Sequence, residues 1–354
     1  MRIVSITGAR PQFMKAAVIS NSIRDYNLKN VARPIQEILI HTGQHYDYEM
    51  SQTFFEELDI PEPAVNLDIR SSLQGEMTGL MISALEKELN FHKPDCVLVY
   101  GDTNSTLAGA LAASKLLIPI AHIEAGLRSF NRKMPEEINR IVVDNISDFL
   151  FCPSRKAVDQ LLKEDISENV FLSGDVHYDS LLHSKSKVTP SDRKGPFALA
   201  TIHRPENTDN TDRLQTIFLA LKECAIPVVL PVHPRTQKEL DKAGIKPGGS
   251  LEIINPLSYL SMMGHLTDCS FVITDSGGLQ KEAYFSGKRC LIVRSETEWT
   301  ELLDCGASML VGGFESGAHL ACEWALKPLE KNNEIYGNGT AGTFIVEKLV
   351  GLLK

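Results

Sequence analysis

At 354 residues the chain is longer than a single hydrophobic core usually allows, so two domains are expected. The net charge of −9 argues against a general nucleic-acid binder, which needs a basic surface. The most apolar stretch, residues 107–123, is interrupted by Ser114, Lys115 and His122 and is too short to span a bilayer. We therefore expect no nucleic-acid partner and no membrane partner.

The cysteines and the N-terminus indicate a cytoplasmic protein. Seven cysteines are scattered without a C-x-x-C pair, which predicts neither a disulfide framework nor a zinc site. The N-terminal MRIVSITGAR turns polar and glycine-containing too early for a signal peptide.

In the first half of the chain, short β-branched runs alternate with helical patterns. The expected strands are residues 3–6, 38–41, 96–100, 118–123 and 149–152, and the expected helices are residues 15–24, 48–58, 75–89, 106–116 and 136–146. The strands are continuous apolar runs, which indicates a parallel sheet covered by helices on both faces. Such a doubly wound α/β sheet binds ligands at the carboxyl ends of its strands.

The same pattern restarts after a turn at residues 173–175. The strands expected there are residues 197–202, 228–232, 252–254, 271–274 and 290–293, and the helices are residues 211–222, 236–243, 258–265 and 279–286. We predict two Rossmann-like domains, 1–173 and 174–340. An amphipathic helix at about 341–354 is expected to pack back on the first domain.

Two strand ends in the first domain carry basic or polar groups. In TGARPQFMK, Gly8 permits a tight turn, and Arg10 and Lys15 flank a helix start suited to anionic oxygens. Both could equally be surface charges. In HTGQHYD, His41 and His45 lack a third metal ligand and are interpreted as hydrogen-bonding residues.

Three acids stand out in the first domain: Asp102 in GDTNST, Glu124 in HIEAG and Glu136 in MPEEINR. Asp102 could simply cap a helix, and one of Glu136 and Glu137 could serve only the helix dipole. Glu124, at a strand end before two small residues, is harder to explain by folding. Arg140, one turn after Glu136, can orient that carboxylate or bind an anion.

In the second domain, two histidines follow successive strands, His203 in ATIHRPEN and His233 in VLPVHPR, and are predicted to line one crevice.

The motif TDSGGLQKEA runs from a strand into a helix. Ser276, Gly277 and Gly278 at the helix start predict a phosphate cradle, because the first amides of a helix attract anions. Glu282 could accept hydrogen bonds from sugar hydroxyls. A plain helix cap with a glycine turn is the other interpretation.

Two doubly wound domains with this cradle describe the GT-B architecture of nucleotide-sugar enzymes. The motifs GARPQFMK, HTGQHYD, VYGDTNSTLAGALAA, HIEAGLRS, MPEEINR, HRPENT, PVHPR and TDSGGLQKEA occur in one order along the chain. In that order they resemble the non-hydrolysing UDP-N-acetylglucosamine 2-epimerases over essentially the whole length.

The resemblance implies roles for residues at matching positions. Asp102, Glu124, Glu136 and His203 match the family's catalytic residues. Its substrate-binding positions are matched by Arg10, Lys15, Arg140, His233, Ser276, Gly277, Gly278 and Glu282. The family needs no metal and no nicotinamide cofactor, acts on a UDP-sugar bound between its domains, and is expected to form homodimers.

The implied reaction eliminates UDP to leave a 2-acetamidoglucal and then re-adds UDP with C2 inverted. The alternatives are a hydrolysing 2-epimerase that releases N-acetylmannosamine, a GT-B glycosyltransferase, and an inactive sugar-nucleotide sensor. The intact set of acids argues against the last two.

Two features resemble the branch acting on UDP-2,3-diacetamido-2,3-dideoxyglucuronate, a surface-polysaccharide precursor. The link before the PEE motif is the short, basic RSFNRKM, and VRSETEWTELL lacks an arginine–proline pair found in another branch. A sugar 6-carboxylate would give Arg128, Arg132 or Lys133 a partner. Tyr46 and Asp47 replace part of the family's pattern for an activating UDP-GlcNAc, so activation by that ligand is not predicted.

Overall fold

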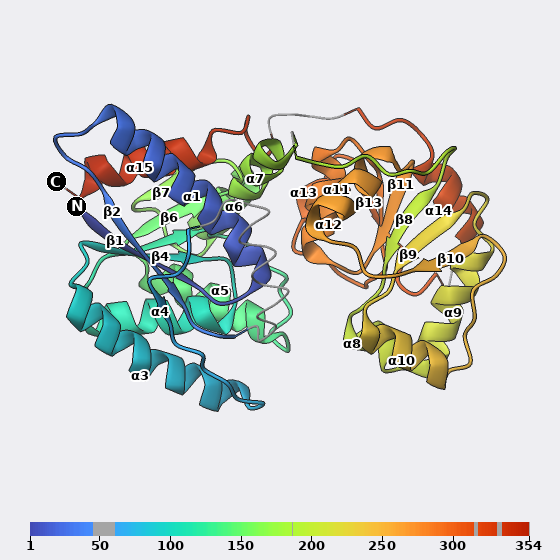
Figure 1. Cartoon of the computed structure of the whole chain (residues 1–354), viewed down its shortest axis with the longest axis horizontal. Coiled ribbons are helices and arrows are strands. Elements are labelled where there is room, and N and C mark those ends of the chain that lie inside the picture. Colours follow the sequence, from blue (N-terminus) through green and yellow to red (C-terminus); the bar gives the residue numbers. More distant parts are fainter. Residues whose placement is uncertain (45–60, 186, 315–317, 331–334, 354) are drawn as a thin grey trace. The chain divides into compact units, whose positions relative to one another are not determined.

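The computed structural model describes residues 1–44, 61–185, 187–314, 318–330 and 335–353. The chain divides into two compact units (Figure 1). Unit 1 comprises Met1–His183 and Asn333–Lys354, and unit 2 comprises Ser184–Asn332. The chain therefore forms most of unit 1, then unit 2, and returns to unit 1 for a final helix. The division lies after residue 183, whereas the sequence prediction placed it after residue 173.

In the described part of unit 1, seven parallel strands form one sheet in the order β3-β2-β1-β4-β5-β6-β7. They are β1 (Arg2–Thr7), β2 (Gln36–His41), β3 (Val65–Asn66), β4 (Cys96–Tyr100), β5 (Ile120–Ile123), β6 (Phe149–Cys152) and β7 (Val170–Leu172). The helices are α1 (Arg10–Lys29), α3 (Gln74–His92), α4 (Asn104–Lys115), α5 (Pro135–Ile146), α6 (Arg155–Lys163), α7 (Val176–Ser184) and α15 (Ala341–Leu352). The strand order reverses between β1 and β4, which makes their carboxyl ends the expected ligand position.

Small side chains bring α4 close to the sheet. Every residue of β4 is buried, and α4 presents Ala108, Gly109 and Ala112 as buried positions. A Cβ added at Gly109 would lie 2.8 Å from the Cδ1 atom of Ile6, so no larger residue fits without rearrangement. Helices α3, α4 and α5 contact one another in series, and α1 packs against α15 on the opposite face (Figure 1).

Unit 2 repeats the architecture with strand order β10-β9-β8-β11-β12-β13 in its described part. The strands are β8 (Ala198–Thr201), β9 (Val228–Pro231), β10 (Leu251–Ile254), β11 (Phe271–Thr274), β12 (Cys290–Ile292) and β13 (Ser308–Leu310). The helices are α8 (Pro205–Thr208), α9 (Thr211–Lys222), α10 (Pro234–Lys242), α11 (Tyr259–Asp268), α12 (Gly277–Phe285), α13 (Thr300–Asp304) and α14 (Ala318–Ala325). Here the order reverses between β8 and β11.

The predicted α/β class with two doubly wound, Rossmann-like sheets is confirmed. Three predicted strands have the observed bounds, namely β4, β6 and β11. The edge strands β3, β7 and β13 were not predicted, because two or three residues are too few to show a pattern. The helix expected at residues 48–58 lies outside the described residues. Within the described ranges, no helix has the length and apolar composition needed to cross a bilayer.

Candidate active site

The turn between β1 and α1 is held by one buried side chain, Gln12. Its Oε1 atom accepts hydrogen bonds from the amides of Gly8 and Ala9 at 2.8 and 3.0 Å, and its Nε2 donates to the Tyr100 carbonyl at 2.9 Å. Gln12 therefore fixes the β1 turn against the end of β4. Arg10 begins α1, and its side chain lies outside what the structure describes.

The end of β2 packs against the start of α4. The Gln44 Oε1 atom accepts hydrogen bonds from the Ser105 amide and hydroxyl at 3.1 and 2.7 Å. His41 stacks on Phe13 with ring centroids 5.1 Å apart, and its Nδ1 accepts from the Gly43 amide. His41 thus has the hydrogen-bonding role predicted for it. His45 lies outside the described residues.

Glu124 and Lys15 form a buried ion pair, with side-chain exposures of 8% and 7%. Lys15 lies in the second turn of α1, and Glu124 directly follows β5 with a left-handed φ of 73°. A positive φ is rare and unfavourable for a non-glycine residue, and such strain concentrates at functional sites. Lys15 and Glu124 come from separate sequence motifs, and the sequence analysis assigned each of them a role without pairing them.

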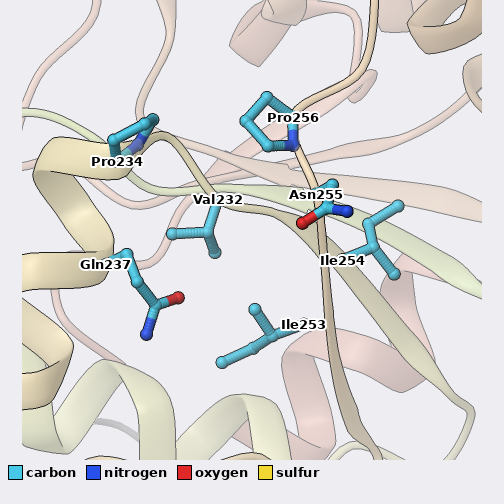
Figure 2. A pocket seen from close by; sticks show the side chains of 7 residues that line it. All are labelled: Val232, Pro234, Gln237, Ile253, Ile254, Asn255 and Pro256. Atoms are coloured by element: carbon cyan, nitrogen blue, oxygen red, sulfur yellow. The ribbon is translucent and has the colours of Figure 1, made fainter.

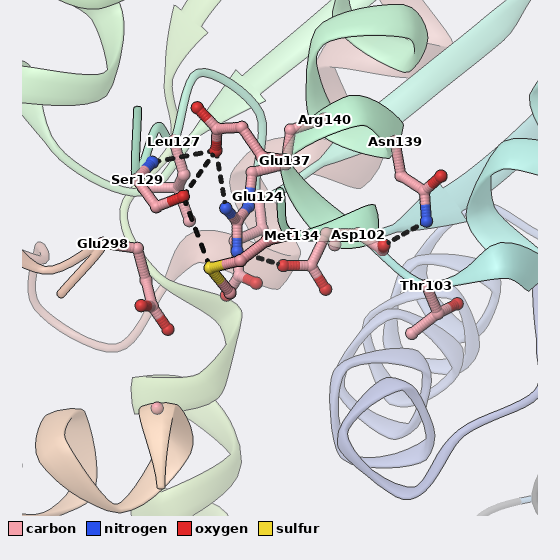
Figure 3. A network of polar contacts seen from close by, with 12 residues as sticks. Asp102, Thr103, Glu124, Leu127, Ser129, Met134, Glu137, Asn139, Arg140 and Glu298 are labelled. Atoms are coloured by element: carbon pink, nitrogen blue, oxygen red, sulfur yellow. Dashed lines mark hydrogen bonds and ion pairs between the residues drawn. The ribbon is translucent and has the colours of Figure 1, made fainter. Parts of the chain in front are cut away.

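Asp102 pairs with Arg140, whose Nη2 lies 2.5 Å from its Oδ2 (Figure 3). The Nη1 of Arg140 donates to Glu137 at 2.8 Å, and the Asn139 amide donates to the Asp102 carbonyl. Asp102 thus touches α5 through both its side chain and its backbone. Its side chain is 31% exposed, which leaves the carboxylate accessible to a ligand.

The two adjacent glutamates of α5 have different environments. Glu137 is buried and accepts a hydrogen bond from the Ser129 amide at 2.8 Å (Figure 3). It also accepts from the Phe130 amide at 2.8 Å. Burial opposes its ionisation, but hydrogen bonds from Ser129 and Arg140 outweigh burial and lower the pKa of Glu137 below its ordinary value. Glu136 is exposed. Glu137 therefore anchors the preceding loop, whereas Glu136 is accessible to a ligand.

Arg128 is not available to a sugar carboxylate, contrary to one of our three suggestions. Its guanidinium donates to Glu164 at 2.8 and 2.6 Å and to Asp144 at 2.7 Å, and its side chain is 2% exposed. Burial alone would lower the pKa of Arg128, but hydrogen bonds and charge from Glu164 and Asp144 raise it. Arg132 and Lys133, on the same short link, are exposed.

In unit 2, His203 faces a fully buried aspartate. Its Nδ1 lies 3.1 Å from the Asp275 Oδ1, and its side chain is 52% exposed. The same carboxylate accepts hydrogen bonds from the backbone amides of His203 and Arg204 and from the Asn207 side chain. Asp275 therefore holds the turn after β8 and orients the imidazole, and the exposed ring can still reach a ligand.

The predicted cradle lies at the start of α12, directly after β11. Ser276 occupies the N-cap position without a side-chain cap hydrogen bond, and its amide donates to the Thr274 hydroxyl at 2.9 Å. A Cβ added at Gly277 would lie 2.4 Å from the Glu298 Oε1, so a larger residue there would require the Glu298 carboxylate to move. The first amides of a helix have no helical carbonyl to bind and can bind an anion. Gly278 continues this turn, and Glu282 follows in the same helix, buried.

His233 caps α10, where its Nδ1 accepts from the Arg235 amide at 3.4 Å, and it is exposed. Beside it lies a pocket of about 580 Å³ at the carboxyl ends of β9 and β10 (Figure 2). The pocket is lined by Val232, Pro234, Gln237, Ile253, Ile254, Asn255 and Pro256. Apolar walls with two amide side chains suit a flat heterocycle. The sequence analysis missed this pocket, although the run NPLS after β10 marks its rim.

Parallel pairing brings the unit 2 residues to one edge of their sheet. β9, β8 and β11 are neighbours in that order, so His233, His203 and Ser276 follow three adjacent strands. In unit 1, the turns after β1, β4 and β5 meet in the same way. Within the described ranges, no three His, Cys, Asp or Glu side chains are grouped as a metal site would require.

Comparison with known proteins gives one family. The family model described as UDP-N-acetylglucosamine 2-epimerase matches residues 29–350. A UDP-2,3-diacetamido-2,3-dideoxy-D-glucuronate 2-epimerase from Pseudomonas aeruginosa is 48% identical, with 99% of this chain and 100% of that protein aligned. A UDP-N-acetylglucosamine 2-epimerase homolog from Methanococcus maripaludis is 46% identical over 99% and 100% of the two chains.

A solved structure is also similar throughout. The crystal structure of Methanocaldococcus jannaschii UDP-GlcNAc 2-epimerase in complex with UDP-GlcNAc and UDP has a TM-score of 0.86 and 38% identity, covering 99% of this chain and 100% of that one. The resemblance inferred from the motifs is therefore confirmed, including the similarity to the diacetamido-glucuronate branch.

Proposed function

Because the chain belongs to the UDP-N-acetylglucosamine 2-epimerase family, we propose that it inverts C2 of a UDP-N-acetylhexosamine without releasing a free sugar. It is an isomerase. The observation that carries the proposal is the pair of engaged acids at the edge of the unit 1 sheet: Glu124 bound to Lys15, and Asp102 bound to Arg140. The Lys15 and Arg140 side chains hold these two carboxylates at the strand ends, where a carboxylate can accept a proton or face positive charge.

The proposed reaction has two halves. First, the C1–O bond breaks, UDP leaves with the bonding electrons, and a carboxylate removes the C2 proton to give a 2-acetamidoglucal. UDP then re-adds to C1 while a proton arrives at C2 from the other face. Asp102, Glu124 and Glu136 are assigned to charge stabilisation and proton transfer, and His203 to proton transfer near the leaving group.

We assign the diphosphate to the start of α12, at Ser276, Gly277 and Gly278, with His233 and Glu282 as further contacts to the UDP moiety. Arg10, Lys15 and Arg140 are assigned to substrate binding in unit 1. Lys15 and Arg140 act through their paired acids, Glu124 and Asp102.

The nucleobase is assigned to the pocket beside α10. Neighbouring strands lie about 4.8 Å apart, so β9 and β10 are roughly 10 to 14 Å from β11 along the sheet edge. That separation matches the length of a nucleoside diphosphate. The Gln237 and Asn255 amides can donate to and accept from a uracil edge.

For the sugar, we favour a 2,3-diacetamido-2,3-dideoxyglucuronate. The 48% identical relative bears that substrate's name, and Arg132 and Lys133 on the short link offer exposed cations for a 6-carboxylate. UDP-GlcNAc itself is the second candidate, because two relatives at 38% and 39% identity are named as UDP-N-acetylglucosamine 2-epimerases.

The test is the reaction in heavy water with each of the two UDP-sugars. Deuterium at C2 of recovered UDP-sugar is expected, with faster incorporation for the diacetamido-glucuronate. Faster exchange with UDP-GlcNAc reverses the substrate assignment. Free sugar plus UDP as the main product indicates the hydrolysing alternative. No incorporation with any UDP-HexNAc rejects the epimerase function.

We further infer a cytoplasmic homodimer that supplies surface-polysaccharide precursors. The absence of a membrane-spanning helix in the described chain supports a soluble setting, and two-fold dimers are the commonest oligomers. Light scattering of the purified protein tests the dimer.

A further inference from the structure

The two acid-bearing turns of unit 1 meet a single buried histidine, His122. It lies on β5 with 0% exposure. Its Nε2 is 2.8 Å from the Gly101 carbonyl oxygen, and its Nδ1 is 2.7 Å from the Asp144 Oδ1. A carbonyl oxygen can only accept a hydrogen bond, so Nε2 must carry a proton.

Asp144, on α5, holds the other ring nitrogen. Its Oδ2 also accepts from Arg128 at 2.7 Å and from the Gly126 amide at 3.2 Å. Burial opposes ionisation of this carboxyl, yet hydrogen bonds and charge from His122 and Arg128 lower the pKa of Asp144 below its ordinary value. The Nδ1 of His122 is thus held by a carboxylate that also binds Arg128 and the Gly126 amide. Glu164 pairs with Arg128 and completes this four-residue cluster.

The cluster contacts both turns through their backbones. Gly101 has a φ of 64° and directly precedes Asp102, while Glu124 and Gly126 have φ values of 73° and 82°. The Gly101 amide donates to the Ile123 carbonyl at 2.9 Å, which joins the two turns directly. His122 then holds the first turn and Asp144 the second, so neither acid can move without disturbing the same buried pair.

We propose that His122, together with Asp144, is a positioning residue for the C2 inversion: its ring, held at both nitrogens, sets the backbone of Asp102 and Glu124. The inference rests on the proposed function but concerns residues that touch no substrate. The positioning role accounts for the place of Asp144 on α5, two turns after Glu137 and on the side that contacts His122.

The principal variant is His122→Phe, which keeps a flat ring and removes both hydrogen bonds. Misplacing a catalytic group by about 1 Å costs roughly a hundredfold in rate, so kcat is expected to fall by about that factor while KM and UDP affinity change by less than about threefold. Leu85→Ala is the matched control, because it removes an equally buried side chain from the unit 1 core. It is expected to lower the thermal midpoint but not kcat.

A double variant, His122→Gln with Asp144→Asn, supplies rescue. The introduced glutamine amide can donate to Gly101 and accept from the introduced asparagine amide, restoring hydrogen bonds without charge. We expect kcat to recover roughly tenfold relative to His122→Phe, in line with the effect of restoring a positioned group. Equal kcat values for the double variant and His122→Phe would contradict the positioning role.

Nitrogen-15 NMR of histidine-labelled wild type gives a readout independent of activity. One ring, assigned by its loss in the variant, should carry a proton on Nε2, because this nitrogen donates to the Gly101 carbonyl. A ring without a proton on Nε2 overturns the proposal, as does a His122→Phe kcat within about threefold of the Leu85→Ala control. If His122→Phe does not fold, Asp144→Asn is used for the same kcat comparison. A wild type without C2 exchange instead rejects the proposed function and leaves the NMR result standing.

Discussion

The same architecture occurs in both units, but the strand ends carry different chemistry. In unit 1 the turns after β4 and β5 present acids paired with buried cations, Lys15 with Glu124 and Arg140 with Asp102. In unit 2 the corresponding acid, Asp275, is buried and fully engaged with backbone amides and side chains. What faces a ligand there is a helix start, exposed histidines and an open pocket.

The difference suggests a division of work between the units. The Asp102 carboxylate is 31% exposed and held by one cation, whereas the Asp275 carboxylate is fully buried among several donors. Under the proposed function, unit 1 carries the reacting acids, and unit 2 carries the UDP contacts together with His203, which is assigned to proton transfer. Substitutions of the unit 1 acids and of His203 should change kcat, and substitutions at the cradle and the pocket of unit 2 should change affinity.

The largest effect is expected for Glu124→Gln. The amide keeps the shape but cannot act as base or pair with Lys15, so turnover should fall by roughly a hundredfold or more. Deuterium exchange at C2 measures the loss, and calorimetry should show UDP affinity retained. Glu86→Gln, on the exposed side of α3, is the matched control. Full activity of Glu124→Gln removes Glu124 from the mechanism.

Next is Gly277→Ala in unit 2. The added methyl group would lie 2.4 Å from the Glu298 Oε1, so it displaces that carboxylate and covers the α12 start where the diphosphate is assigned. Losing hydrogen bonds to a charged group costs about 1.5–3 kcal/mol, so UDP affinity should fall by roughly tenfold or more. Gly79→Ala in α3, where an added Cβ meets nothing within 4 Å, is the control and should leave UDP affinity unchanged. Unchanged UDP binding by Gly277→Ala would show that the diphosphate lies elsewhere.

A smaller effect on binding is expected for Gln237→Ala in the pocket. One neutral hydrogen bond contributes about 1 kcal/mol, so UDP affinity should fall by roughly fivefold with kcat unchanged. Uridine binding, compared with binding of pyrophosphate alone, isolates this contact. An equal loss for pyrophosphate contradicts the nucleobase assignment.

The smallest effect concerns stability. Asp179 in α7 accepts a hydrogen bond from the Gly342 amide at 2.9 Å, and burial raises the pKa of its carboxyl to about 6, with Asp175 adding to the rise. The folded state therefore holds a proton that the unfolded state releases near pH 3.8. This contribution to stability is present at low pH and is lost as the pH rises towards about 6.

In Asp179→Asn the carbonyl oxygen still accepts from Gly342 but does not titrate. Denaturant unfolding between pH 4 and pH 7 should show a smaller decline in stability for the variant than for wild type. Identical pH dependence would mean that Asp179 titrates alike in both states.

Sequence reasoning recovered the sheets because their central strands are unbroken apolar runs, as in β4 and β11. It recovered the middle of α1 but not its first and last turns, since Pro11 in the first turn could equally mark a loop. It suggested that Arg140 orients Glu136, whereas the structure pairs Arg140 with Asp102 and Glu137.

Other contacts depend on tertiary structure alone. The position of Arg128 in the sequence does not indicate that it is buried and paired with Glu164. In the sequence, Asp144 cannot be distinguished from any other acidic residue of a helix. Likewise, Lys15 and Glu124 are 109 positions apart, and only the folded sheet joins them. The pocket beside α10 depends on the path of the backbone after β10. The residue types in that segment do not indicate a pocket.

The return of the chain to unit 1 has a consequence for synthesis. Helix α15 packs on α1, and the Asp179 carboxylate binds the Gly342 amide at its start, yet all of unit 2 separates these partners in the chain. A ribosome must therefore deliver unit 2 before unit 1 can bury the face of α1 that α15 covers. During translation unit 2 can finish folding first, and unit 1 is completed last.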